Sequence, residues 1–343
     1  MSYNPDKTVL IKAILDAFGN TAKTNKREIF DDVLQPSNAE KYMTTIRGVK
    51  GVYEMQRSEV SEVTQPYQDK FTPKGTMQFK PNEIMMRRAK IDMAFTIDKF
   101  VNSYMSWLVE DGKNREDQKI TRYMLDEVIR KSKEDRGKIA VLGKYTAPTD
   151  GVASAAVDTV DGVAYKLSQI QENPEHGLNA IEVSNFEGAP FDYVLALFRA
   201  FSNQEHLLEA CGNTFFTSKA NVNAVADAWQ QDNAYKNVKW VGGDDYGIYI
   251  PNTPGKIIGL NHMDGDRFFA TPKWNFLRLV DQIDELGKLE VQKFERILKF
   301  LADYSLAYGF GFNKWVYTNV ATTGTHIADS GEGEGEGEGE GEA

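Results

Sequence analysis

The most constraining feature of this sequence is a long polar stretch, residues 49–97, in which apolar and polar side chains alternate. Its two flanks, GVYEMQRSEVSEVTQ and EIMMRRAKIDMAFTI, have the periodicity of strands, and the phase of the second changes near Arg87 and Arg88. The link between the flanks is rich in proline, glycine and lysine, which predicts a polar tip. Such an extended hairpin cannot bury itself. We expect it to be a solvated arm or to lie on a neighbouring molecule.

Charged side chains are spread along this predicted hairpin. Because the whole chain is acidic, with a formal net charge of -10 at pH 7, we interpret the basic ones as ion-pair partners of a neighbouring subunit, in preference to phosphate contacts. The candidate inter-subunit contacts are Glu54, Arg57, Glu59, Lys70, Lys74, Lys80, Arg87 and Arg88.

Length and composition place broad limits on the chain. It has 343 residues, 41% of them hydrophobic, which suits two or three packed units because single cores usually stop growing near ~250–300 residues. An acidic chain is not a dedicated reader of DNA or RNA, since such proteins have a concentrated basic patch. The one cysteine, Cys211, excludes an intramolecular disulfide and suits a reducing cytosol. No apolar run of about 18 residues predicts a membrane span.

Three segments of the first half have helical periodicity. Asp6–Phe18 is a short amphipathic helix that lacks the apolar core and cleavage site of a secretion signal. Ile97–Glu110 is a second helix, and Arg115–Lys138 is a longer one whose outer face alternates charges. A loop of small residues, GKYTAPTDGVASAAVDTVDG, follows the long helix.

The second half reads as a mixture of helices and strands. Pro190–Phe201 is predicted to be a helix and NTFFTSK a buried strand, and Ser218 is a plausible N-cap of the helix that follows. Four short strands come next, and a last strand pair ends near Val320.

The C-terminus ends in SGEGEGEGEGEGEA. Alternating glycine and glutamate maximise chain entropy and self-repulsion, and the segment has no apolar face for a strand. We expect this tail to be disordered and dispensable for assembly.

Motifs that would carry catalysis are weak. The four histidines are scattered, without metal-ligand spacing to each other or to Cys211. Walker, Rossmann, HExxH and GxSxG patterns are missing. In HMDGDR, the side chains of His262, Asp264 and Asp266 offer a divalent-cation site, but an Asp-Gly turn between strands accounts for the same residues and is favoured. We therefore predict no cofactor, no metal site and no enzymatic activity.

Three smaller features receive structural interpretations. Cys211 is expected to be a buried, inert thiol. The glycines of GFGF, residues 309–312, indicate a kink in a strand. In RFFATPKWNFLRLVD, Pro272 should end a strand, and Trp274 and Phe276 should anchor the chain in a core as it crosses from one part of the fold to another.

The order of these parts resembles the major capsid proteins of tailed bacteriophages, the Hong Kong 97-type fold, over roughly residues 20–320. Two passages are most similar to the branch known from phages of Bacteroidetes-type hosts. One is the small-residue loop GKYTAPTDGVASAAVDTVDG, and the other is ATPKWNFLRLVD followed by KFERILKFLADYSLAYGFGFNKWVYTN.

The resemblance implies an α+β fold divided into an arm, a loop, two domains, a return segment and a tail. These are an N-terminal arm (1–48), an extended hairpin loop (49–97), a peripheral domain with a spine helix (98–188), an axial domain (189–272), a C-terminal return segment (273–320) and the Gly/Glu tail (321–343).

The resemblance also implies a function. Subunits would assemble in the host cytoplasm into hexamers and pentamers of an icosahedral virion shell, which encloses double-stranded DNA without recognising its sequence. Portal, scaffold or decoration proteins would be further partners, and no membrane is involved. Two alternatives stay open: an encapsulin-like nanocompartment shell, and a metal-dependent enzyme that uses Asp264, Asp266 and His262.

Overall fold

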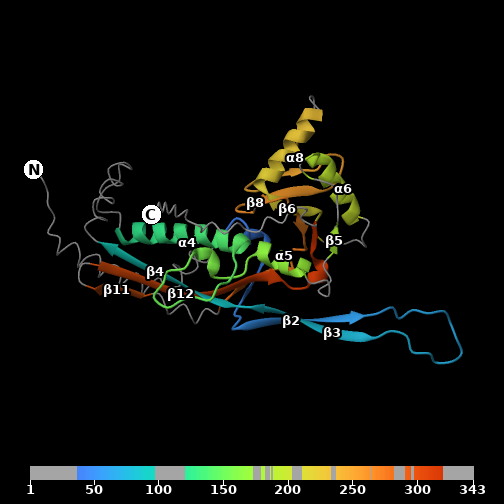
Figure 1. The fold of residues 1–343 in the computed structure, drawn as a ribbon, viewed down its shortest axis with the longest axis horizontal. Coiled ribbons are helices and arrows are strands. Elements are labelled where there is room, and N and C mark those ends of the chain that lie inside the picture. The colour runs from blue at the N-terminus through green and yellow to red at the C-terminus, as the bar shows by residue number, and fades with distance from the viewer. Residues whose placement is uncertain are drawn as a thin grey trace, which may run out of the picture.

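The computed structural model describes most of the chain between residues 37 and 319. The described residues are 37–96, 120–172, 179–181, 186, 188–202, 211–232, 237–263, 265–281, 290–294 and 297–319. The predicted helices Asp6–Phe18 and Ile97–Glu110, and the Gly/Glu tail, lie outside these residues. Figure 1 shows an elongated lobe built on a long helix and long strands, a compact lobe set at an angle to it, and a hairpin that projects from their junction.

The elongated lobe contains a five-stranded sheet. Its strands, in the order β1-β10-β12-β11 with β4 also paired to β12, are β1 (Thr44–Arg47), β10 (Phe276–Val280), β12 (Ile297–Phe310), β11 (Glu290–Phe294) and β4 (Arg87–Thr96). The helices of this lobe are α4 (Ile120–Leu142) and α5 (Val163–Glu172). The long predicted helix is thus confirmed, with its described part ending four residues later than expected.

The compact lobe contains a six-stranded sheet in the order β5-β13-β9-β6-β8-β7. Its strands are β5 (Asn179–Ile181), β13 (Tyr317–Asn319), β9 (Phe269–Ala270), β6 (Thr214–Ser218), β8 (Lys256–Leu260) and β7 (Gly247–Tyr249). Its helices are α6 (Pro190–Ser202) and α8 (Lys219–Asp232). Three short 3-10 helices complete the description: η1 (Glu40–Tyr42), η2 (Ala156–Asp158) and η5 (Asn313–Trp315).

Local sequence signals account for much of the compact lobe. All five residues of β6, TFFTS, are buried, as predicted for this strand. The predicted cap of α8 is confirmed, because the backbone N–H of Asn221 donates to Ser218 Oγ at 3.1 Å. β6 and β8 are parallel neighbours that are connected through α8, the connection that parallel strands require.

Two apolar cores hold the lobes together. One lies among α4, α5 and both sheets, where the rings of Phe276 and Phe310 stack at 5.5 Å. The other lies between the six-stranded sheet and the helices α6 and α8, where Phe201 stacks on Phe215 at 5.2 Å. Because the first core takes residues from both sheets, the junction of the two lobes is itself well packed.

The chain crosses between the two sheets within residues 271–275, from β9 to β10. Phe276 is fully buried, as predicted, but Trp274 is 45% exposed, so its expected role as a core anchor is wrong. The buried position belongs to Asn275, whose backbone N–H donates to Pro272 O at 2.9 Å in the turn between the two sheets. A polar side chain suits this position because it bonds to the Thr271 hydroxyl and to the backbone N–H and C=O of Phe312.

The predicted hairpin is shorter than the sequence indicates. β2 (Val52–Val60) pairs with β3 (Met77–Met85), in register from Val52↔Met85 to Val60↔Met77. The second flank was expected to form one strand, but it breaks at Met86, whose N–H donates to Gly51 O at 2.8 Å. The remainder, β4, leaves the hairpin and pairs with β12. This pairing covers a long strand edge that would otherwise be open, and the break coincides with the phase change near Arg87.

The glycines of GFGF allow close approach, in place of the predicted kink. β12 runs through Gly309 to Phe310. A Cβ at Gly309 would lie 3.1 Å from Ile84 Cδ1, and one at Gly311 would lie 2.5 Å from Met55 Sδ. The missing side chains therefore let the root of the hairpin sit directly on the end of β12.

Candidate assembly surface

The root of the hairpin is fixed to the elongated lobe. Asn82 Nδ2 donates to Phe310 O at 2.8 Å and to Gly311 O at 2.9 Å. Ile84 is buried in a small core with Leu277 and Leu279 of β10. The direction in which the hairpin leaves the body is therefore determined by packing and by hydrogen bonds.

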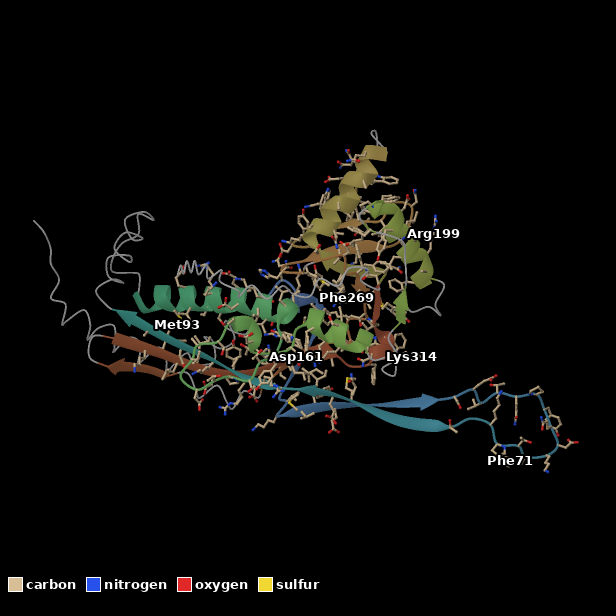
Figure 2. The ribbon with its side chains drawn as sticks, in the orientation of Figure 1. Phe71, Met93, Asp161, Arg199, Phe269 and Lys314 are labelled. Carbon is tan, nitrogen blue, oxygen red and sulfur yellow. The ribbon has the colours of Figure 1, made fainter. Side chains whose placement is uncertain are left out.

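The tip of the hairpin, which we define as Ser61–Thr76, is closed by bonds of its own. The Ser61 N–H donates to Thr76 O at 3.0 Å, the Thr76 N–H donates to Ser61 Oγ at 2.7 Å, and Gln65 Nε2 donates to Thr72 O at 2.8 Å. Every hydrogen bond and ion pair described for the tip joins two tip residues. Figure 2 shows Phe71 at this outer end, away from both lobes.

Two aromatic side chains of the tip were missed by the sequence analysis. Tyr67 and Phe71 are each 90% exposed, which is the highest exposure among the large hydrophobic side chains described. Two further apolar side chains are exposed: Val63 within the tip, and Met77 directly after it. The available signal was two aromatic residues inside the polar link PYQDKFTPKG. The proline, glycine and lysine content of the link predicted a polar tip, and the two aromatic residues were not considered, although aromatic residues are typical anchors of interfaces.

The predicted charged contacts fall into three separate places. Lys70 and Lys74 are at the tip, where Lys74 Nζ lies 3.0 Å from Glu62 Oε1 and Lys70 is exposed. Glu54 is exposed near the root. For Arg57, Glu59 and Lys80, the structure describes the backbone pairing of β2 with β3 and not the side chains.

Arg87 and Arg88 lie on β4, in the body of the subunit, and both have partners there. The Arg87 guanidinium carbon is 3.7 Å from the centroid of the Tyr145 ring. Arg88 Nη2 is 3.8 Å from Asp303 Oδ2, and both side chains are largely exposed. Their role in contacts between subunits stays a prediction.

The register of the hairpin places like charges opposite each other. Glu54 is paired with Glu83, and Arg57 is paired with Lys80. Residues directly opposite across antiparallel strands share a face, and like charges at such positions are destabilising. The isolated subunit therefore gains nothing from this charge pattern, whereas oppositely charged groups of another molecule would relieve it.

In segment 37–43, in contrast to the hairpin, a charged side chain is buried and paired with oppositely charged groups of the same subunit. The buried carboxylate of Glu40 lies 3.2 Å from Arg278 Nε, and it accepts the Tyr308 hydroxyl at 2.5 Å and the Ser37 N–H at 2.6 Å. Burial by itself would raise the pKa of Glu40, but Arg136 and Arg278 and the two hydrogen bonds bring that pKa below its ordinary value. The carboxylate is thus ionised and matched by buried partners from α4, β10 and β12.

Residues 41 and 42 reach the other lobe. Lys41 Nζ lies 2.6 Å from Asp245 Oδ1, which also accepts the Tyr42 hydroxyl at 2.7 Å. Burial tends to raise the pKa of Asp245, but the bonds from Lys41 and Tyr42 lower it below its ordinary value. Segment 37–43 therefore ties the two lobes together by charge as well as by packing.

The residues of the enzyme alternative occupy a turn. His262 and Gly265 have positive φ angles of 63° and 72°, and the carbonyl of Asp266 accepts Asn319 Nδ2 at 2.6 Å. His262 and Asp266 border a shallow pocket of about 450 Å³ at the start of α8. Asp264 lies outside the described residues. Within the described ranges, no group of three or more His, Cys, Asp or Glu side chains is placed to hold a metal ion.

Cys211 is buried, as predicted, and burial raises the pKa of its thiol to about 12. The thiolate needed for nucleophilic chemistry is therefore disfavoured at neutral pH. The histidines at 176, 206 and 326 lie outside the described residues. Among the helices of the described part, none is long and apolar enough to cross a membrane.

Comparison with known proteins gives matches to solved structures alone. No protein-family model and no curated protein matches the chain. A chain in the structure of the satellite phage P4 procapsid including size determination (Sid) protein is 8% identical, with a TM-score of 0.50, and the match covers 85% of this chain and 98% of that one. A chain of the capsid of Myoviridae phage XM1 is 9% identical, with a TM-score of 0.48 and 84% and 90% covered.

A chain of a virus-like particle from Pyrococcus furiosus is also similar, at 9% identity and a TM-score of 0.40, with 85% of this chain and 96% of that one covered. The match to the P4 procapsid chain spans most of this chain and nearly all of that one. This chain therefore has a mixed helix and sheet fold that it shares with a chain of a phage procapsid.

Proposed function

We propose that this chain is a major capsid protein of the Hong Kong 97 type, the shell subunit of a tailed phage of the kind that infects Bacteroidetes-type hosts. The observation that carries the proposal is the projecting hairpin β2–β3, whose tip exposes Tyr67 and Phe71 and bonds only to itself in the described structure. Two exposed aromatic rings at the end of a long arm do not stabilise a monomer, whereas in an assembling subunit they can be buried against a neighbouring molecule. The fold shared with a phage procapsid chain supports the same reading.

The charge pattern of the hairpin supports a partner of the same kind. The register pairs like-charged residues at Glu54↔Glu83 and Arg57↔Lys80, and both signs are present on one arm. A second copy of the chain offers both signs in return, so the pattern favours contact between identical subunits. If the hairpin of each copy contacts a different surface of the next copy, the contacts repeat head to tail and form rings where the rotation between copies closes; these rings would be the hexamers and pentamers of an icosahedral shell.

The same proposal assigns roles to the lobes. Residues 98–188, with α4 as the spine helix, would form the peripheral domain, residues 189–272 the axial domain at the symmetry axes, and residues 273–320 the return segment. Residues 1–48 would be the N-terminal arm. Tight packing at the junction of the lobes supports a subunit that moves as one body during assembly.

The net negative charge of the subunit is compatible with a shell that encloses DNA. A subunit with a net charge of -10 would repel DNA weakly at long range and enclose it without recognising its sequence. Assembly in the host cytoplasm, with portal, scaffold or decoration proteins as further partners, belongs to the same proposal.

Electron microscopy and sedimentation of the purified full chain test the proposal directly. Closed particles of uniform size are expected, and nucleic acid inside particles from infected cells would identify a virion shell. Particles that enclose a co-purifying enzyme would instead identify a nanocompartment. A subunit that stays monomeric under all assembly conditions would contradict both readings.

Removal of the tip tests the role of the hairpin. We would replace Glu62–Gly75 by Asn-Gly, a two-residue turn that suits antiparallel strands, so that β2 and β3 remain paired. The subunit should fold with unchanged thermal stability and should not form shells. The matched control is Gln68→Ala, an exposed change within the tip that keeps both aromatic rings and every candidate charged contact, and which should still form shells. Normal shells from the shortened hairpin would exclude the tip from assembly.

A further inference from the structure

Asp-Gly dipeptides recur along this chain, four in all, whereas Asn-Gly does not occur. Two of the four are fully described, Asp150–Gly151 and Asp161–Gly162, and both lie between α4 and α5. Their local sequences are closely alike, TDGV and VDGV. A difference in chemical behaviour between these two dipeptides would therefore come from their surroundings in the fold.

An aspartate that is followed by glycine can rearrange without an enzyme. The glycine nitrogen attacks the side-chain carboxyl carbon, a C–N bond forms, and the nitrogen proton and the carboxyl hydroxyl leave as one water molecule. Water then adds to a carbonyl carbon of the five-membered imide and opens the ring. Opening at the main-chain carbonyl leaves the peptide connected through the side chain, as isoaspartate, with one additional methylene in the backbone. Glycine favours the first step because it has no Cβ to hinder the approach.

The surroundings of Asp150 and Gly151 leave this route open. Both residues are exposed, and a Cβ at Gly151, whose φ is +81°, would meet nothing within 4 Å. They occupy the centre of a turn in which the Val152 N–H donates to Thr149 O at 3.2 Å. Among the described residues, no hydrogen bond engages the Asp150 carboxylate or the Gly151 N–H. The nitrogen and the carboxyl carbon can therefore approach each other without losing a bond of their own.

Asp161 and Gly162 are instead held at both reacting groups. Asp161 Oδ1 accepts the Tyr145 N–H at 3.0 Å, and its Oδ2 lies 3.1 Å from Lys166 Nζ. The Gly162 N–H donates to Gly143 O at 2.7 Å, and backbone atoms fill the space around Gly162. Figure 2 shows Asp161 within the elongated lobe. Rearrangement at this dipeptide requires these bonds to open first.

We propose that Asp150 is a site of spontaneous isomerisation to isoaspartate in the folded subunit, and that the fold protects Asp161 from the same reaction. The inference goes beyond the proposed function and does not depend on it, because it rests on the surroundings of two dipeptides in one chain. In a shell, whose subunits are not replaced after assembly, the modification would accumulate with the age of the particle.

The subunit tolerates an additional methylene at Asp150. The ends of the loop are paired, since the Thr146 N–H donates to Asp158 O at 3.0 Å. Between these ends, residues 146–155 are all exposed. Lengthening the backbone at Asp150 therefore displaces no packed side chain and leaves the fold intact.

Ageing of the purified full chain tests the proposal within a single peptide. Trypsin cleaves after Lys144 and Lys166 and releases residues 145–166, which contain both dipeptides. The folded chain is kept at neutral pH and physiological temperature and is then digested. Electron-transfer fragmentation of the peptide distinguishes isoaspartate from aspartate at each position. Isoaspartate at Asp150 should exceed that at Asp161 on the order of tenfold or more, because the hydrogen bonds at Asp161 must open first.

Two controls separate the effect of the fold from that of the sequence. Asp150→Glu keeps the charge but would require a six-membered imide, which forms more slowly, so this variant should lack the product. In the chain aged in guanidinium chloride, Asp150 and Asp161 should react at similar rates. Equal levels at the two positions in the folded chain, or a difference that persists in the denaturant, would overturn the proposal.

Thermal unfolding of the aged chain tests the tolerance of the fold. The midpoint should equal that of the fresh chain, and a midpoint that falls as the isoaspartate content rises would show that the loop does not absorb the change. Failure of the chain to form particles would defeat the proposed function and leave this inference standing.

Discussion

Segment 37–43 and the hairpin β2–β3 both carry glutamate side chains, but the surroundings of these carboxylates are opposite in kind. Glu40 is buried and bonded to Arg278, Tyr308 and the Ser37 backbone. On the hairpin, Glu54 is exposed and faces another glutamate across the strands. The first arrangement stabilises the subunit and the second does not. The Glu40 carboxylate therefore contributes to the stability of the subunit, whereas the Glu54 carboxylate is available for contact with another molecule.

The largest effect is expected at Glu40. Glu40→Ala leaves Arg136 and Arg278 buried without their carboxylate, and breaking a buried ion pair in this way costs about 3–5 kcal/mol. Urea unfolding of the unassembled subunit measures the loss. A decrease below about 1 kcal/mol would show that the cluster relaxes into water and would weaken the contrast with the hairpin.

The same cluster predicts a pH dependence. The pKa of Glu40 is lower in the folded subunit than its ordinary value of 4.5, so the unfolded chain binds the proton more tightly. The stabilisation is therefore complete above about pH 4.5 and is lost as the pH falls from there through the folded pKa. Unfolding free energies measured between neutral pH and the acid range should fall more steeply for the native chain than for Glu40→Gln.

A smaller effect is expected at Asn275, where the chain crosses between the sheets. Asn275 Oδ1 accepts the Phe312 N–H at 2.6 Å, and its Nδ2 donates to Phe312 O and to Thr271 Oγ1 at 3.0 Å each. Asn275→Ala leaves these buried groups unpaired and should cost about 1–3 kcal/mol of subunit stability in urea unfolding. Trp274→Ala, the exposed neighbour, is the control and should change stability far less.

Some of these features could be predicted from sequence patterns, and others could not. The strand TFFTS and the cap at Ser218 were predictable because their signals are local: two adjacent phenylalanines, and a serine before a helix. Trp274 was predicted to be a core anchor, but its neighbour Asn275 is the buried residue, because which of two adjacent side chains points inward depends on the turn at Pro272.

Contacts between segments that are far apart in the chain could not be predicted from the sequence. Glu40, Arg136 and Arg278 meet across more than two hundred residues of chain, and no spacing between them signals the meeting. The division of the second hairpin flank had a local sign, the phase change near Arg87, but the partner of β4 is β12, near the other end of the chain. Strand pairing of this kind depends on the whole fold, which a single sequence does not display.

The root of the hairpin should be sensitive to added volume. Gly311→Ala places a Cβ 2.5 Å from Met55 Sδ and 3.2 Å from Asn275 Oδ1, so the root must shift, at an expected cost of about 1–2 kcal/mol, within the range for overpacking. Because Met55 is flexible, Met55→Ala should restore part of the loss in the double variant. Thermal unfolding of the four chains completes the cycle. Strictly additive losses would show that the contact with Met55 does not limit this site.

The smallest effect on the subunit is expected at Glu54, and its sign is opposite to the others. Glu54→Lys places a cation opposite Glu83 and replaces a repulsion by an attraction, so the free subunit should become more stable, by about 0.2–1 kcal/mol at low salt and less at high salt. If the hairpin charges serve contacts between copies, the same change should raise the concentration needed for assembly. Glu83→Lys is the matched control, because it makes the same intrachain pair from the other strand. If Glu54→Lys makes the subunit more stable and also lowers the concentration needed for assembly, the hairpin charges, like Glu40, act within the subunit.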